Sequence, residues 1–137
     1  MIKNVSLGRE ITVTATNKVG ILADITKSIA EHGINIEGIA GYVEPDTITA
    51  RIMLLTDENR RALDILKEKG YDASEEYEIV IVELENKPGA LKIVSEKLAA
   101  EGIDIQYTYG TTCATACPCR MVFATNNNDK AVVTLKK

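Results

Sequence analysis

The chain of 137 residues contains an internal repeat. When the sequence is shifted by 69 positions, residues 10–67 fall on residues 79–136 without a gap, and sixteen of these 58 pairs are identical. Ordinary composition would give roughly four identities by chance. The period is longer than the repeat of most solenoids, so each copy is expected to be a small domain. The sequence therefore predicts two copies of one folding unit.

The first copy has the pattern of a mixed α and β unit. Its first strand is expected at 11–16, where apolar and polar residues alternate. A helix is expected next, because apolar residues recur at helical spacing at Ile21, Leu22, Ile25 and Ile29. The two strands of a hairpin are expected at 34–42 and 47–56. A helix that begins at a Thr-Asp pair is expected at 57–69, and a short strand at 71–76. This order predicts an α+β fold of two tandem ferredoxin-like βαββαβ units, with the helices on one face of antiparallel sheets.

The second copy lacks a final strand, because its second helix is expected at 127–136. An uncovered sheet edge favours aggregation. We therefore expect the N-terminal segment, which contains Ile2, Val5 and Leu7, to supply the missing edge strand beside 78–84; a frayed tail is the alternative. The expected domains are an N-terminal strand, a first unit and a second unit, at 1–9, 10–76 and 77–137.

Composition excludes several classes of function. The net charge is −4, with a sequence pI of about 5.1, which gives no reason to expect nucleic acid or an anionic membrane as a partner. No apolar run approaches the roughly 20 residues of a membrane span, and no signal peptide is evident. The single histidine excludes a site that needs several. Three cysteines do not suggest a secreted disulfide framework, so a cytoplasmic protein is expected.

The turn between the first strand and the first helix is the strongest candidate for a ligand site. It reads Asn-Lys-Val-Gly at 17–20 and Asn-Lys-Pro-Gly at 86–89, with Pro88 suited to the first helical position. Unpaired amides at a helix N-terminus favour a carboxylate. Asn35 and Asp104, at the start of the next strand in each copy, offer oxygen to an ammonium group. Together they would suit a free amino acid, although the same spacing also describes a turn that needs no ligand.

These residues resemble the ACT domain family. The motif Asn-Lys-Pro-Gly-Ala-Leu, a helix closed by glycine and then Ile-Asp-Ile or Ile-Asn-Ile occurs once per copy, and the resemblance covers nearly the whole chain. It implies βαββαβ regulatory modules that bind amino acids, often where two such domains meet. The ligand contacts that it implies lie on the turn and on the start of the second strand: Asn17, Gly20, Ile21, Leu22, Asn35, Asn86, Pro88, Gly89, Ala90, Leu91 and Asp104. Val19 in place of proline and Asp104 in place of asparagine predict two unequal sites.

The three cysteines allow a second interpretation. Cys113, Cys117 and Cys119 lie within seven positions, and three thiolates can hold a soft metal. The repeat instead aligns Cys117 and Cys119 with Ile48 and Ala50, which are expected on the core face of the third strand, where a thiol packs as a small hydrophobe. Cys113 is expected in the hairpin loop. The structural interpretation is preferred, no cofactor or metal is expected, and metal or redox use stays open.

The other face of the expected sheet is also apolar. Met53, Leu55, Val122 and Ala124 share it with Arg51 and Arg120. An antiparallel sheet exposes a face only if that face is polar. We therefore expect another chain to cover it, which predicts a homodimer.

No combination of residues indicates catalysis, since no Ser/His/Asp or Cys/His arrangement is present and His32 is isolated. The leading hypothesis is a non-catalytic regulatory protein that binds a small amino acid where ACT-like units meet and signals to an enzyme or regulator. The alternatives are a ligand-independent regulatory or interaction subunit of a metabolic enzyme and a cysteine-based metal or redox protein.

Overall fold

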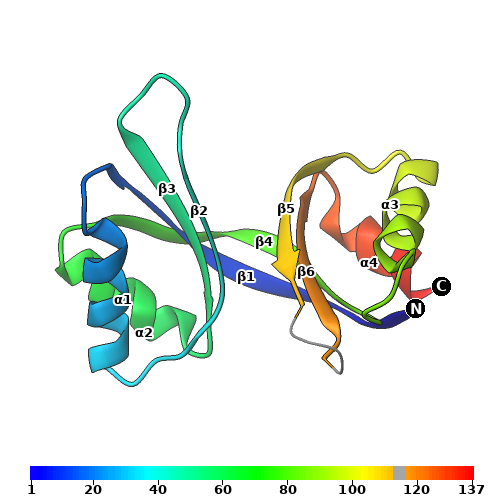
Figure 1. The fold of residues 1–137 in the computed structure, drawn as a ribbon, viewed down its shortest axis with the longest axis horizontal. Helices are drawn as coiled ribbons and strands as arrows, with labels where there is room; N and C mark the ends of the chain where they lie inside the picture. Colours follow the sequence, from blue (N-terminus) through cyan, green and yellow to red (C-terminus); the bar gives the residue numbers. More distant parts are fainter. Residues whose placement is uncertain (113–116) are drawn as a thin grey trace. The chain divides into compact units, whose positions relative to one another are not determined.

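The computed structural model describes residues 1–112 and 117–137, which form two compact units (Figure 1). The first unit is Arg9–Tyr77, and the second joins Met1–Gly8 to Glu78–Lys137. Two long strands, β1 (Ile2–Thr16) and β4 (Asp72–Leu84), contribute to both units. The strand expected at 11–16 is therefore the second part of a 15-residue strand.

The first unit has its strands in the order β2-β3-β1-β4. Its elements besides parts of β1 and β4 are α1 (Ile21–Glu31), β2 (Ile36–Val43), β3 (Thr49–Thr56) and α2 (Asn59–Glu68). β3 pairs antiparallel with both β1 and β2, with Val13 opposite Ile52. Figure 1 shows α1 and α2 next to each other. The apolar faces of both helices pack on one face of the sheet, and the core of the unit includes Ile11, Val13, Ile25, Ile29, Leu54 and Leu66.

The second unit repeats this arrangement in the order β1-β4-β6-β5. Its other elements are α3 (Ala90–Ala100), β5 (Ile105–Thr111), β6 (Cys119–Thr125) and α4 (Asn128–Lys136). β4 and β6 are antiparallel, with Val82 opposite Met121. The core of this unit includes Val5, Val80, Val82, Val94, Leu98, Phe123 and Leu135.

The N-terminal segment supplies the edge strand of the second unit. Val5 is only 4% exposed and belongs to the core of that unit. The Met1 carbonyl accepts a hydrogen bond of 2.8 Å from the amide of Glu85, directly after β4. The expected fold class, with two βαββαβ units and an N-terminal edge strand, is confirmed.

A threonine and an asparagine three residues later start the second helix of each unit. The Asn59 side-chain oxygen accepts from the amide and the hydroxyl of Thr56 at 3.0 and 2.8 Å, while its Nδ2 donates to the Arg9 carbonyl at 2.9 Å. Asn128 makes the same three bonds in the second unit, with Thr125 and the Glu78 carbonyl. One side chain thus joins the end of a strand, the start of a helix and a second strand. Because this geometry places the start of α2 at Asn59, the helix begins two residues after the expected Asp57.

The apolar outer face is already covered in the single chain. Met53, Leu55, Val122 and Ala124 are all buried without a second copy. The expectation that another chain must cover these four residues is therefore wrong, and it no longer supports a homodimer. Within the described ranges 1–112 and 117–137, no helix combines the length and the apolar character needed to cross a membrane.

Candidate ligand-binding site

The turn before each first helix has the same backbone in both units. Gly20 and Gly89 stand directly before α1 and α3 in the left-handed conformation, with φ of 91° and 89°. A Cβ on Gly20 would meet nothing within 4 Å, so its positive φ, and not lack of space, requires glycine here. Because α3 begins at Ala90, Pro88 lies before the capping residue and not at the first helical position that the sequence suggested.

The first turn of α1 presents free main-chain donors. The Asp24 amide donates to the Gly20 carbonyl at 3.0 Å, and the Ile21 amide donates to the Lys18 carbonyl at 3.3 Å. The amides of Leu22 and Ala23 have no acceptor within the described part of the chain. These two donors, at the positive end of the helix dipole, favour an anionic group.

A pocket of about 380 Å³ opens beside this turn in the first unit. We call it the turn pocket; its lining is apolar apart from one asparagine and the tyrosine hydroxyl, and consists of Asn17, Ile21, Leu22, Ile39, Ala40, Gly41, Tyr42, Val43, Ala50 and Ile52. It brings together three of the residues proposed from the sequence, Asn17, Ile21 and Leu22. The Asn17 side-chain amide forms no hydrogen bond within residues 1–112 and 117–137, so it is available to a ligand. The pocket thus has a polar end at the turn and an apolar wall on β2 and β3.

The sequence reasoning did not identify the hairpin side of the turn pocket. Ile39 and Val43 on β2 are partly exposed although they are large and apolar. Their separation by four residues, within and directly after the strand expected at 34–42, was an available signal. The register of the hairpin decides which face of the sheet these two side chains occupy. The structure supplies that register and places them on the face that α1 covers.

Asn35 lies outside the turn pocket. It follows the C-terminal end of α1, and an 11-residue helix separates it from the turn by about 16 Å. Its amide donates to the Asp57 carboxylate at 2.9 Å, and its carbonyl accepts from the Asp57 amide at 3.1 Å. Asp104 is held in the same way by Asn126 in the second unit. Within one unit, therefore, the turn and the start of the second strand do not come together.

The turn of the second unit is partly covered by the N-terminus. The Met1 ammonium pairs with one oxygen of Glu85 at 3.0 Å, and Lys87 pairs with the other at 2.9 Å. The methyl carbon of Met1 lies 3.7 Å from where a Cβ of Gly89 would stand. Ala90 is buried, whereas Asn86, Pro88 and Leu91 are exposed. The two turns thus have different surroundings despite their shared backbone.

The ion pairs at Glu85 give the fold a dependence on acidic pH. Hydrogen bonds from Lys87 and from the N-terminus lower the pKa of Glu85 from 4.5 to about 2. The folded state binds the ionised Glu85 carboxylate more favourably than the protonated one. The ionised carboxylate therefore stabilises the fold fully above pH 4.5, and this stabilisation is lost as the pH falls toward 2. We expect Glu85→Gln to reduce the loss of stability in this interval, as measured by urea unfolding at a series of pH values. Glu96→Gln, on an exposed carboxylate of α3, should leave the loss unchanged; equal profiles for both variants and the parent would contradict the assignment.

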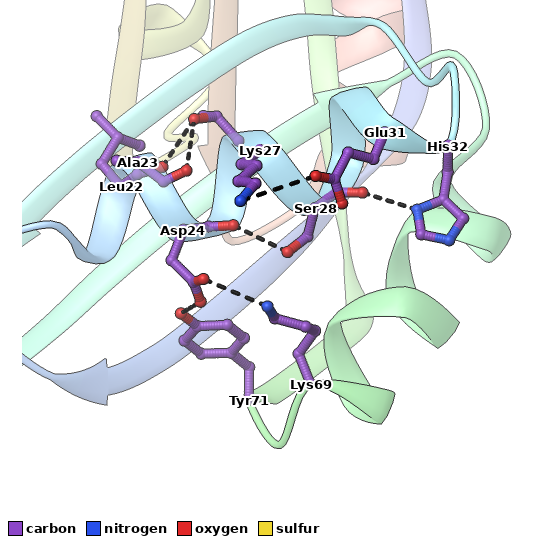
Figure 2. Close-up of polar contacts among 10 residues, drawn as sticks. Leu22, Ala23, Asp24, Lys27, Ser28, Glu31, His32, Lys69 and Tyr71 are labelled. Atoms are coloured by element: carbon purple, nitrogen blue, oxygen red, sulfur yellow. Dashed lines mark hydrogen bonds and ion pairs between the residues drawn. The ribbon is translucent and has the colours of Figure 1, made fainter.

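A polar cluster anchors the first turn of α1 (Figure 2). The Asp24 carboxylate accepts a hydrogen bond from the Tyr71 hydroxyl and pairs with Lys69 at 3.3 Å. These contacts lower the pKa of Asp24, while burial and the bond to Asp24 raise the pKa of Tyr71 to about 12. We call Asp24, Lys69 and Tyr71 the Asp24 clasp. It ties α1 to the segment that follows α2, and so fixes the helix that bears one wall of the turn pocket.

Of the two cysteines that were expected in the core, only Cys119 packs against it. Cys117 is exposed, precedes β6 and is disulfide-bonded, so its expected place in the core is wrong. Its repeat equivalent, Ile48, is 69% exposed and likewise precedes β3, which explains the error. Cys119 is a free thiol that packs partly buried against the core, as expected. Cys113 lies outside the described residues. Among the residues described, no group of three or more His, Cys, Asp and Glu side chains is placed to hold a metal ion.

Comparison of the sequence with protein families matches residues 11–69 to the family described as the AHAS small subunit-like ACT domain. The match falls on the unit that contains the turn pocket. No curated protein matches the chain significantly.

Solved structures match the chain over almost its whole length. A protein of Bacteroides thetaiotaomicron is 25% identical, with a TM-score of 0.86 and coverage of 98% of this chain and 90% of that one. The regulatory subunit of aspartate kinase from Thermus thermophilus, in its ligand-free form, is 15% identical, with a TM-score of 0.65 and coverage of 98% and 96%. The aspartate kinase of Clostridium acetobutylicum is 15% identical, with a TM-score of 0.59 and coverage of 98% and 33%. The last two share the fold. Residues 11–69 therefore match an ACT domain, and the chain as a whole shares its fold with these solved structures.

Proposed function

We propose that this chain is a non-catalytic regulatory protein that binds a free amino acid in the turn pocket and signals its presence to an enzyme or regulator. The observation that carries the proposal is the turn pocket itself, which places a polar helix N-terminus beside an apolar cavity. Its volume of about 380 Å³ lies within the usual range for small-molecule sites.

Each part of the pocket suits one part of an amino acid. The free amides of Leu22 and Ala23 and the side chain of Asn17 suit a carboxylate. Ile39, Val43 and Ile52 offer an apolar surface to the side chain of the ligand. No charged residue lines the pocket, and a buried charge without a partner is costly, so a ligand with an apolar side chain is favoured over a charged one.

The ammonium group needs a partner outside the turn pocket. Asn35 is too far from the turn of its own unit to serve, as the length of α1 shows. We propose that a second copy of the chain provides this contact, in a homodimer. The exposed apolar side chains Ile39, Tyr42 and Ile48 around the hairpin of β2 and β3 support an association at this edge.

The proposal of an enzyme as partner rests on analogy. The ACT-domain match at residues 11–69 and a fold shared with a regulatory subunit of aspartate kinase support a regulatory role and an enzyme partner. Similarity of fold alone does not specify the enzyme. The partner is therefore proposed as an enzyme or regulator that responds to the liganded state.

Thermal unfolding in the presence of each of the twenty amino acids tests ligand binding. A ligand at one hundred times its Kd should stabilise the folded chain by roughly 2.7 kcal/mol. We expect Asn17→Ala to abolish most of this stabilisation, because Asn17 lines the turn pocket. The matched variant Asn86→Ala, at the same repeat position in the second unit, should keep it.

The possible results separate the hypotheses. If Asn86→Ala removes the stabilisation by the amino acid and Asn17→Ala does not, the ligand binds in the second unit and not in the turn pocket. No stabilisation by any amino acid would reject the sensor and favour a ligand-independent interaction subunit. Sedimentation with and without the stabilising amino acid tests the dimer separately, since a monomer in both conditions would exclude a contact from a second copy.

A further inference from the structure

The second unit contains a larger pocket that the proposed amino-acid site does not use. This pocket, of about 560 Å³, lies where the start of β1 meets α3 and the C-terminal end of α4. Four of its ten lining residues are lysines, and none is acidic: Lys3, Lys97, Lys136 and Lys137. We call it the lysine pocket. Its other walls include Ile93 and the buried side chains of Val5 and Leu135.

The repeat shows how unusual this concentration of charge is. The first unit has Asp24 where the second has Ile93, Ser28 in place of Lys97, and Glu68 in place of Lys137. Only Lys67 and Lys136 match. In the first unit Asp24 belongs to the Asp24 clasp, where its carboxylate meets the Tyr71 hydroxyl and the Lys69 ammonium (Figure 2). The second unit therefore has three lysines and an isoleucine at positions where the first has two carboxylates, one lysine and a serine.

The lysines of the pocket have no anionic side chain as a partner. Elsewhere in the described chain, five lysines form an ion pair with an acidic side chain and two, Lys18 and Lys67, do not; the five are Lys27, Lys69, Lys87, Lys92 and Lys130. No such pair involves the four lysines of the pocket in the ranges 1–112 and 117–137, and the Lys97 ammonium instead donates to a main-chain oxygen of Lys137, the last residue of the sequence, at 3.1 Å. The Met1 ammonium, also at the pocket, is already paired with Glu85. Ammonium groups that converge without an acidic side chain among them repel one another, and a bound anion would relieve that repulsion.

We propose that the lysine pocket binds a small phosphate-bearing anion. Ammonium groups are compact donors that bind phosphate oxygens as point charges. The lysines come from β1, from α3, and from the last residue of α4 and the residue after it, so they can surround several phosphate oxygens. The apolar surface of Ile93 suits an organic part of the ligand, and the volume suits a small molecule. This site is separate from the turn pocket, since the two share no residue and belong to different units.

Titration calorimetry with sodium tripolyphosphate at low ionic strength tests this site. The chain has a net charge of −4, so general attraction to a polyanion is not expected. Replacing Lys97 and Lys136 together with glutamine should weaken binding about tenfold or more, because hydrogen bonds to charged groups are lost. The matched control replaces Lys27 and Lys67 with glutamine. This control changes the net charge by the same amount but in the first unit, where Lys67 is the repeat equivalent of Lys136. It should change the affinity for tripolyphosphate by less than about twofold.

Amide chemical shifts provide a readout that does not depend on the variants. Tripolyphosphate should shift the amides of Lys3, Ile93 and Lys97 and leave those of the Asn17–Gly20 turn in place. Absence of both heat and shifts with the parent chain would overturn the proposal. Equal weakening by the two double variants would also overturn it, because it would show only a general effect of charge.

Discussion

Replacing Phe123 with alanine is expected to lower the free energy of unfolding of the second unit by about 3–5 kcal/mol. Phe123 is 2% exposed and lies on β6 opposite Val80, in the core beneath α3 and α4. Alanine would lose the transfer energy of the ring and leave a cavity that close-packed neighbours fill only partly. Urea unfolding measures the loss, and native-state amide exchange assigns it to a unit.

A second apolar residue of the same unit provides the control. Val133 on α4 is 58% exposed, so Val133→Ala should change the free energy of unfolding by no more than about 0.5 kcal/mol. Amide protection in the Phe123→Ala variant should fall first in the second unit. Small and equal losses for both variants would contradict the core assignment.

Alanine at Gly110 is expected to cost about 1–3 kcal/mol, whereas alanine at the equivalent Gly41 is expected to be tolerated. A Cβ on Gly110 would lie 2.5 Å from the Arg120 carbonyl oxygen and 3.0 Å from the Met121 Cα. These are backbone atoms of the neighbouring strand, so a change of rotamer cannot relieve the contact. At Gly41 the nearest atoms, in Ile52 and Arg51, stand 3.6 and 3.7 Å away, which is ordinary van der Waals contact.

The glycine pair is informative because both residues occupy the same repeat position. Thermal and urea unfolding of Gly110→Ala and Gly41→Ala measure the difference directly. Gly41→Ala should lie within about 0.5 kcal/mol of the parent chain. If the two variants lose stability equally, the close approach of β5 to β6 at Gly110 is not the cause.

The fold class was predictable because the repeat supplies the same evidence twice. Each copy has its own strand alternation, helical spacing and turn residues, and agreement between local patterns and one overall arrangement is what specifies a fold. The Thr56–Asn59 and Thr125–Asn128 pairs are identical in the repeat, but their role needs coordinates. Each asparagine also binds the carbonyl of a strand distant in sequence, at Arg9 or Glu78.

The turn pocket was predictable only on its helical side. Asn17, Ile21 and Leu22 are close in sequence, so a local motif contains them. If side chains alternated regularly from Ile36, Ile39 would lie on the other face of β2. The structure instead has an irregularity between Ile36 and Gly38. As a result, Ile39 pairs with Leu54 and Val43 pairs with Ala50 on the neighbouring strand. A single bulged residue reverses which side chains face the helices, and the hydrophobic pattern of the sequence does not indicate where such a residue occurs.

The separation of Asn35 from the turn of its own unit was also not evident from the sequence. Two candidate polar sites were combined because each suits one end of a zwitterion, without regard to the helix between them. The length of α1 keeps them apart in one unit. The lysine pocket was also hidden in the sequence, since Lys3 and Lys97 become neighbours only when β1 joins the second unit.

The division of β1 between the units has a consequence for biosynthesis. Arg9–Tyr77 forms a continuous stretch and can fold as soon as it leaves the ribosome, whereas Met1–Gly8 must wait for Glu78–Lys137. Until then the apolar Val5 has no core to enter. Synthesis of the whole first unit thus separates Met1–Gly8 from the residues that complete its own unit.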